Sequence, residues 1–222
     1  YFPVGWVKKD GQTYINIWHG TPLKKLGLAK NANGKHKDGN TQKNFIEADY
    51  LLYPNEYTKV HMLESYKVAT LIQGKALNLG YPRTGGMLAA SKADLHELRA
   101  ELAPNGEHLY AYMPTWKDYL EVEQVVAESK ELLDYLDANL RDDQILYVNL
   151  QHKVSDALDY SVYKRIKKCP PTVDSYQLLA LTDALLTEYS SVFYDYLALR
   201  RQIILYCGDY KLYRKKRGTY MD

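Results

Sequence analysis

Two histidines of this chain stand at the ends of runs of residues that favour β-strands. His19 follows residues 14–18, and His152 follows residues 145–150. Imidazole can take a proton near neutral pH, and its charged form can stabilise a phosphoryl oxygen. The pair therefore predicts acid–base or electrostatic work on a transferring group. For His19 taken alone, a structural histidine in an ordinary turn is an equally good interpretation.

The residues after His19 have the pattern of a helix start. Thr21 suits an N-cap, Pro22 the first helical position, and Gly27 the residue beyond the helix end. Such a helix would turn free backbone N–H groups toward an anion beside His19.

Two more polar motifs follow strand-like runs. Residues 113–118 (Met-Pro-Thr-Trp-Lys-Asp) follow one run, and residues 187–191 (Thr-Glu-Tyr-Ser-Ser) follow another. Either serine of the second motif could start a helix that runs to about residue 200. Simple N-capping needs only one serine, whereas two hydroxyls at a helix start suit a phosphate. Four polar motifs at the carboxyl ends of parallel strands are typical of a ligand crevice.

The elements that position these motifs alternate between strand and helix, which predicts a parallel α/β fold. We expect strands at residues 14–18, 50–53, 68–71, 108–113, 145–150, 184–187 and 202–206. Expected helices cover residues 56–65 with Asn55 as cap, a segment opened by Ser91 and Asp94, residues 121–140, and residues 175–181 after Asp174. Residues 30–44 are predicted to form a flexible loop, and residues 80–86 a hinge between two lobes.

Composition narrows the possible functions. The 222 residues carry a net charge of +2, which does not favour nucleic acid as a partner. The two cysteines are far apart in the sequence, which fits a reducing compartment. The sequence lacks metal-ligand spacings, the glycine motifs of dinucleotide-binding and P-loop enzymes, and any apolar run long enough to span a membrane. Residues 211–218 concentrate five positive charges. They suit either a solvated helix end or contact with a polyanionic acceptor or an anionic membrane surface.

Taken together, the motifs resemble the CDP-glycerol glycerophosphotransferase family, the teichoic acid primases and polymerases of Gram-positive bacteria. The resemblance rests on residues 18–27, 80–83, 114–118, 174–180, 187–195 and 213–220. It implies a GT-B-like α/β architecture of Rossmann-like lobes, with parallel sheets flanked by helices. Residues 1–85 would form the latter part of the first, acceptor-side lobe, and residues 86–222 the second, CDP-donor lobe. The chain, which begins without Met, reads as a piece of a longer protein.

The resemblance also implies a reaction. Glycerol phosphate, or a related polyol phosphate, would pass from CDP-glycerol or another CDP-polyol to a lipid-linked polyol-phosphate acceptor, with release of CMP. No cofactor, metal or nucleic acid is expected. The enzyme would be cytoplasmic and peripheral at the inner face of the cell membrane, attached through parts possibly outside this chain.

Family roles can be carried onto matching residues. His19 resembles the base that activates the acceptor hydroxyl, and His152 resembles a second catalytic histidine that faces the donor pyrophosphate. The residues expected to bind the donor are Thr115, Lys117, Glu188, Ser190 and Ser191. Those expected to contact the acceptor or a phosphate are Thr21, Lys24, Arg83 and Arg217.

Three positions depart from the family pattern. Lys117 replaces a frequent Arg and so lacks the bidentate fork, Glu188 replaces the usual Asp, and Lys153 replaces the Pro that usually follows the second histidine. Two other functions remain open: a GT-B glycosyltransferase that uses a nucleotide sugar, and a non-catalytic binding module for anionic cell-wall polymer. Donor choice separates the first from a CDP-polyol transferase, and two titratable strand-end histidines argue against the second.

Overall fold

The chain forms two compact α/β units. A computed structural model describes residues 2–30, 39–90 and 92–221, with the side chains of residues 92–94 excepted. The first unit contains Tyr1–Pro82 and Asp209–Asp222, and the second contains Arg83–Gly208. The C-terminal segment thus belongs to the first unit rather than to the second lobe in which the sequence placed it. Helix α3 (Pro82–Ala89) runs through the expected hinge at residues 80–86, so most of that segment is helical.

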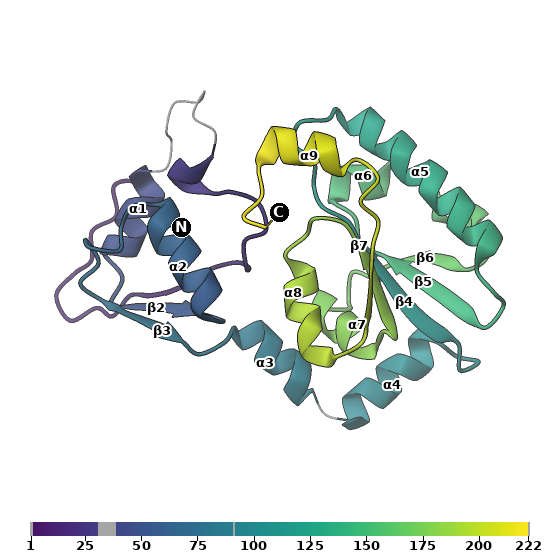
Figure 1. Ribbon diagram of the computed structural model, residues 1–222. Coiled ribbons are helices and arrows are strands. Elements are labelled where there is room, and N and C mark those ends of the chain that lie inside the picture. The colour runs from purple at the N-terminus through teal and green to yellow at the C-terminus, as the bar shows by residue number, and fades with distance from the viewer. Residues whose placement is uncertain (1, 31–38, 91, 222) are drawn as a thin grey trace. The chain divides into compact units, whose positions relative to one another are not determined.

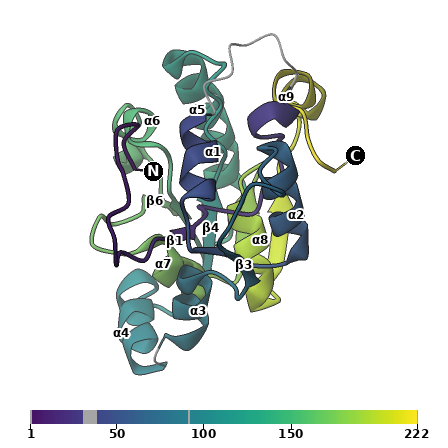
Figure 2. The same ribbon diagram turned by 90° about the vertical axis from the view of Figure 1, so that its left-hand side faces the viewer.

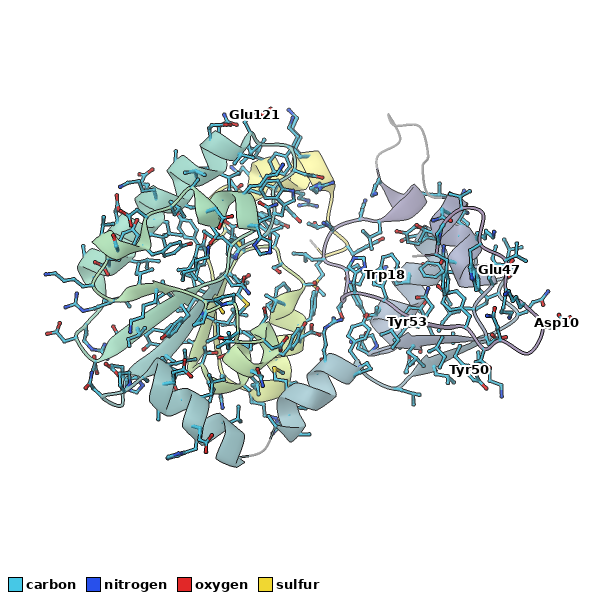
Figure 3. The ribbon with its side chains drawn as sticks, turned by 180° about the vertical axis from the view of Figure 1, so that it is seen from behind. Asp10, Trp18, Glu47, Tyr50, Tyr53 and Glu121 are labelled. Atoms are coloured by element: carbon cyan, nitrogen blue, oxygen red, sulfur yellow. The ribbon has the colours of Figure 1, made fainter. Side chains whose placement is uncertain are left out.

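The first unit is built on a three-stranded parallel sheet in the order β1-β2-β3 (Figure 1). Its strands are β1 (Ile15–Ile17), β2 (Tyr50–Tyr53) and β3 (Lys75–Asn78). Its helices are the 3-10 turn η1 (Gly27–Ala29), α1 (Gly39–Ile46), α2 (Glu56–Ser65) and α9 (Tyr210–Arg217). Trp18 and Tyr53, labelled in Figure 3, lie in a core that they share with side chains of α1 and α2.

Two expectations for this unit are wrong. The expected strand at residues 68–71 is a turn, in which the Val68 carbonyl accepts from the N–H groups of Leu71 and Ile72 at 2.9 and 3.1 Å. Local bonds of this kind occupy the groups that a strand would present to a neighbour, and β3 forms a few residues later. The end of the expected loop at residues 30–44 is helical, since α1 begins at Gly39. Residues 31–38 of that loop lie outside the described residues.

The second unit is built on a five-stranded parallel sheet in the order β6-β5-β4-β7-β8. Its strands are β4 (His108–Met113), β5 (Gln144–Val148), β6 (Ile166–Lys168), β7 (Ala184–Thr187) and β8 (Gln202–Leu205). Its helices, besides α3, are α4 (Lys92–Leu102), α5 (Val122–Asn139), α6 (His152–Asp156), η2 (Tyr160–Val162), α7 (Ser175–Leu181), α8 (Val192–Tyr196) and η3 (Leu197–Leu199).

Alternation along the strands of this sheet divides its core into two layers. Leu109 and Ala111 of β4 face α4, α7 and α8, whereas Tyr112 faces α5 and α6. Figure 1 shows these two groups of helices on opposite faces of the sheet. Both faces of a parallel sheet are covered in this way, so its strands read as nearly continuous apolar runs.

Local signals explain several helix boundaries. The Asn55 side chain accepts from the Thr58 N–H at 2.9 Å, and the Asp174 side chain accepts from two N–H groups at the start of α7. Both caps confirm the sequence prediction. The expected cap at Ser91 lies outside the described residues. Among the residues described, we find no helix with the length and apolar character needed to cross a membrane.

Candidate active site

The loop after β1 carries His19 on the surface of the first unit. Its neighbour Trp18 is buried, and the centroids of the two rings lie 4.3 Å apart. Trp18 in turn packs against Phe45 and Tyr66. A rigid aromatic residue therefore anchors the backbone directly before the exposed imidazole. His19 lies at the carboxyl end of a parallel strand, as predicted.

The prediction of a helix that starts at Thr21 is wrong, because residues 21–26 are not helical. Thr21 is buried and accepts a hydrogen bond from the Thr58 hydroxyl at 3.2 Å. The main chain that follows bonds to other segments: the Pro22 carbonyl accepts from the Tyr57 hydroxyl, and the Leu26 N–H donates to the Tyr220 hydroxyl at 3.0 Å. Groups engaged in this way cannot close the i to i−4 bonds of a helix. The anion site expected at a helix start beside His19 is therefore lost.

The C-terminal segment takes the place of the missing helix as the support of this loop (Figure 2). Lys24 and Thr219 form an antiparallel bridge, the Lys25 N–H donates to the Gly218 carbonyl at 3.2 Å, and the Tyr220 N–H donates to the Leu23 carbonyl at 2.9 Å. The loop thus gains a strand-like partner from nearly two hundred residues away.

Tyr220 completes this support through its side chain. Its ring stacks on His61 of α2 with the centroids 4.3 Å apart, and its hydroxyl forms a short hydrogen bond with Ser65. Gly27 allows the close approach: its φ is +51°, and a Cβ there would lie 2.6 Å from the Ser65 carbonyl oxygen. Sequence reasoning placed Gly27 at a helix end and did not assign a role to Tyr220.

Of the residues predicted to contact acceptor or phosphate, three lie in this unit. Thr21 is buried against α2, Lys24 lies in the antiparallel bridge, and the half-buried Arg217 ends α9. Lys24 and Arg217 are brought to neighbouring segments, because Gly218 and Thr219 pair with the loop directly after α9.

In the second unit, the carboxyl ends of β4 and β7 bring three predicted donor-binding residues together. The Lys117 ammonium lies 3.2 Å from a carboxylate oxygen of Glu188, and both side chains are less than a tenth exposed. The other Glu188 oxygen accepts from the Thr115 N–H at 3.3 Å. Lys117 also lies 6.0 Å from the centre of the Tyr189 ring, a contact that sequence reasoning missed.

This arrangement changes what the cluster offers to a ligand. The Lys117 charge is matched by Glu188, so the pair presents two opposite charges held in place rather than a single cation. The buried Thr115 hydroxyl has no hydrogen-bond partner among the described residues. A buried hydroxyl without a partner is costly unless a ligand or water satisfies it, so Thr115 can offer a donor or acceptor to a bound group.

Ser190 and Ser191 follow Glu188 directly and precede α8. The Ser190 hydroxyl accepts from the Val192 N–H at 3.4 Å, and Ser191 occupies the N-cap position. The expected helix to about residue 200 is realised as α8 and η3, which end where Arg200 adopts φ +54°. Both serines are half-buried at the carboxyl end of β7.

His152 lies beyond the carboxyl end of β5, the strand next to β4. It is the first residue of α6, is exposed, and follows Gln151, whose side chain caps the helix at the Lys153 N–H. Asp156, at the other end of α6, has a lowered pKa, chiefly because it binds Lys168 at 2.9 Å and to a smaller extent because of His152. The prediction of a strand-end position for His152 is confirmed.

Arg83 of α3 forms an ion pair with a carboxylate of α8. Its Nε donates to the buried carboxylate of Asp195 at 3.0 Å, and the Tyr176 hydroxyl donates to the same carboxylate oxygen at 2.7 Å. Burial and this bond raise the pKa of Tyr176. Asp195 thus ties α3 and α7 to α8, the helix that follows the two serines, and Arg83 supplies one of these contacts.

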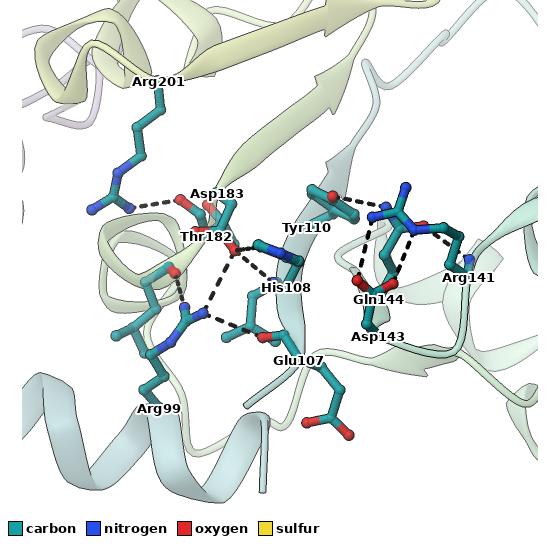
Figure 4. Close-up of polar contacts among 12 residues, drawn as sticks. Arg99, Glu107, His108, Tyr110, Arg141, Asp143, Gln144, Thr182, Asp183 and Arg201 are labelled. Atoms are coloured by element: carbon teal, nitrogen blue, oxygen red, sulfur yellow. Dashed lines mark hydrogen bonds and ion pairs between the residues drawn. The ribbon is translucent and has the colours of Figure 1, made fainter. Parts of the chain in front are cut away.

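The amino ends of β4 and β7 hold a separate polar cluster (Figure 4). Asp183 accepts from the Leu109 N–H at 2.9 Å and lies 3.3 Å from His108 and 3.5 Å from Arg99. These contacts join a helix, a strand and a loop, as a structural cluster does. His108 therefore belongs to a structural cluster at this edge of the sheet. Among the described residues, no group of three His, Cys, Asp or Glu side chains is arranged to hold a metal ion.

Comparison with known proteins now identifies the family. Residues 1–222 match the family described as CDP-Glycerol:Poly(glycerophosphate) glycerophosphotransferase. A teichoic acid poly(glycerol phosphate) polymerase of Staphylococcus epidermidis is 33% identical over 97% of this chain and 31% of its own length. The solved structure of the wall teichoic acid polymerase TagF has a TM-score of 0.80 and 30% identity over 100% of this chain and 56% of that one. A TagF variant soaked with CDPG gives a TM-score of 0.79 with 30% identity, over 99% of this chain and 56% of that one.

The match to TagF confirms the GT-B-like α/β fold expected from the sequence. The chain spans about a third of the staphylococcal polymerase and just over half of TagF. Because the family match runs from the first residue to the last, this chain belongs to the CDP-glycerol:poly(glycerophosphate) glycerophosphotransferase family.

Proposed function

We propose that the protein transfers glycerol phosphate from CDP-glycerol to a growing polyol-phosphate chain of the teichoic acid type. The observation that supports this most is the similarity of the whole chain to a poly(glycerol phosphate) polymerase. The strand-end positions of His19 and His152, and the Lys117–Glu188 cluster beside Ser190, agree with it.

The proposed reaction is an in-line displacement at the β-phosphorus of the donor. An acceptor hydroxyl oxygen forms the new P–O bond, His19 takes its proton, and the bond to the bridging oxygen breaks. CMP leaves with the electron pair of that bond. Reactions of this type depend on positioning and on charge stabilisation, which fixed dipoles and cations can supply.

On the donor side, we assign His152, Lys117 and the two serines to the pyrophosphate oxygens. The Glu188 carboxylate holds the Lys117 ammonium in one position. A lysine fixed in this way gives a directed charge, which partly replaces the orientation that an arginine fork would provide. The Thr115 hydroxyl is free to bond the donor, since no described group satisfies it.

On the acceptor side, we assign Thr21 to holding the His19 loop, and Lys24 and Arg217 to phosphate contacts. We further propose a lipid-linked acceptor, so that the enzyme works in the cytoplasm as a peripheral protein at the inner face of the membrane. Other parts of the whole protein can contribute to that attachment.

The test uses the whole protein, with titration calorimetry of CDP-glycerol, CDP-ribitol, CMP and UDP-glucose, and turnover measured as CMP release. We expect His19→Ala to bind CDP-glycerol like the parent protein but to lose turnover by about a hundredfold or more, the usual contribution of a general base. Normal turnover by a folded His19→Ala protein would refute the assignment of the base. Preferential binding of UDP-glucose would move the protein to the nucleotide-sugar transferases.

A further inference from the structure

The two segments that meet at Gly218–Tyr220 have an unusual charge content. Residues 19–30 and 210–221 hold eight of the 29 lysines and arginines of the chain and none of its 27 carboxylates. The rest of the chain is therefore net negative, although the whole carries +2. The nearest carboxylates in sequence on the C-terminal side, Asp209 and Asp222, flank the segment.

The structure joins these segments into one surface of the first unit. The bridge between Lys24 and Thr219, together with the Lys25–Gly218 hydrogen bond, fixes the loop directly beside the end of α9. We call seven of these eight cations, all except Lys30, the basic surface. Its members are Lys24, Lys25, Lys211, Arg214, Lys215, Lys216 and Arg217.

Helix α9 turns its charges outward. Tyr213 is 1% exposed and anchors the helix, whereas Lys211, Arg214, Lys215 and Lys216 are exposed. Eight residues at 1.5 Å per residue extend the surface by about 12 Å. A single phosphate cannot contact cations over that length. A linear polyanion with regularly spaced charges can.

We infer that the basic surface binds several consecutive phosphates of the acceptor chain, and this inference rests on the proposed function. The surface begins in the loop that carries His19 and continues along α9, so a chain held there has its end near the proposed base. Charge complementarity of this kind recruits the ligand and fixes its direction. An acceptor with many linked polyol phosphates is therefore bound better than one with a single unit.

An anionic membrane is a weaker candidate for this surface. Helices that bind in the membrane interface expose a broad apolar face beside their cations. In α9, Tyr213 is buried in the unit, and Leu212 is the large apolar side chain that this helix exposes. Helix α9 thus lacks the apolar face that insertion into a membrane requires, and the vesicle measurements described below separate purely electrostatic binding to an anionic membrane from binding to a linear polyanion.

The test compares two triple variants of the whole protein that lose the same charge. Lys211→Gln/Lys215→Gln/Lys216→Gln changes the basic surface, and Lys9→Gln/Lys75→Gln/Lys164→Gln changes three exposed lysines elsewhere. Binding is measured with soluble poly(glycerol phosphate), with a single-unit acceptor and with phosphatidylglycerol vesicles, at low and high salt. Turnover with the single-unit acceptor is measured alongside.

We expect the first variant to bind the polymer about tenfold more weakly at low salt, with less difference at high salt, and the control to bind like the parent. Turnover with the single-unit acceptor should stay unchanged in both. Equal polymer binding by the parent and the first variant would overturn the inference, as would a loss confined to vesicle binding. Polymer binding without any turnover would contradict the proposed function but would still support the inference that the basic surface binds the polymer.

Discussion

The buried Lys117–Glu188 pair gives the sharpest stability prediction. At 3.2 Å, two unit charges attract by about 5 kcal/mol at an effective dielectric constant of about 20. Much of this offsets the cost of removing both charges from water, so the pair as a whole contributes little. Loss of one partner is different, because the remaining charge keeps its desolvation cost. We expect Glu188→Leu to lower the free energy of unfolding by about 3–5 kcal/mol.

The asymmetry of the cluster refines this expectation. Glu188→Leu removes the carboxylate from the ammonium and also from the Thr115 N–H, whereas Lys117→Met removes one contact of the carboxylate. Glu188→Leu should therefore be the more harmful single change. The double variant Lys117→Met/Glu188→Leu should lose only about 1 kcal/mol, since no unmatched charge remains buried.

Urea unfolding followed by circular dichroism measures these differences, with the exposed pair Lys130–Asp134 as the matched control. That pair is 2.6 Å long, but its side chains are 59% and 47% exposed. Lys130→Met should cost less than about 0.5 kcal/mol. Single changes at the buried pair that cost as little as the control, or a double change that costs the sum of the singles, would refute the reasoning.

Three further predictions concern other parts of the chain. Gly27→Ala should lower the free energy of unfolding in urea by about 2–4 kcal/mol, because the strain of a positive φ and the clash with the Ser65 carbonyl add together. The control Gly11→Ala, at φ +77° with open space among the described residues, should lower it by about 1 kcal/mol. Equal losses in the two variants would show that the clash contributes nothing. Burial raises the pKa of Tyr147 to about 12 in the folded state, whereas in the unfolded state the phenol ionises near pH 10. The contribution of Tyr147 to the free energy of unfolding should therefore be fully present below pH 10 and be lost between pH 10 and 12. Tyr147→Phe should remove up to about 1.4 kcal/mol per pH unit of that slope, and an unchanged slope would contradict the assignment. Tyr220→Phe loses two hydroxyl hydrogen bonds, so it should lower the free energy of unfolding by about 1–2 kcal/mol and speed amide hydrogen exchange in residues 21–26. Unchanged exchange there would mean that other contacts hold the loop.

The sequence was sufficient wherever the signals were local. The strands at 50–53, 108–113 and 184–187 and the helices capped by Asn55 and Asp174 have the expected bounds. Apolar runs and caps act over a few residues, so the pattern contains the needed information. The short strand β6 was missed because Ile166 is its one buried residue and two exposed lysines follow it.

The loop after His19 shows where local reasoning fails. Thr21, Pro22 and Gly27 form a good helix signal, yet the main chain there bonds to α2 and to the C-terminal segment. Such partners are distant in sequence, and no local pattern indicates them. The same applies to Lys117 and Glu188: both were expected to bind a donor, but their mutual ion pair depends on the adjacency of β4 and β7.

The return of the chain to the first unit has a consequence for synthesis on the ribosome. Residues 83–208 emerge together as one continuous unit and can fold as soon as they are released. The first unit is begun earlier but completed later, because residues 218–220 hold the loop after β1 and are made only after the second unit. During translation, the segment that carries His19 must therefore wait, without its final partner, until the whole of the second unit has been made.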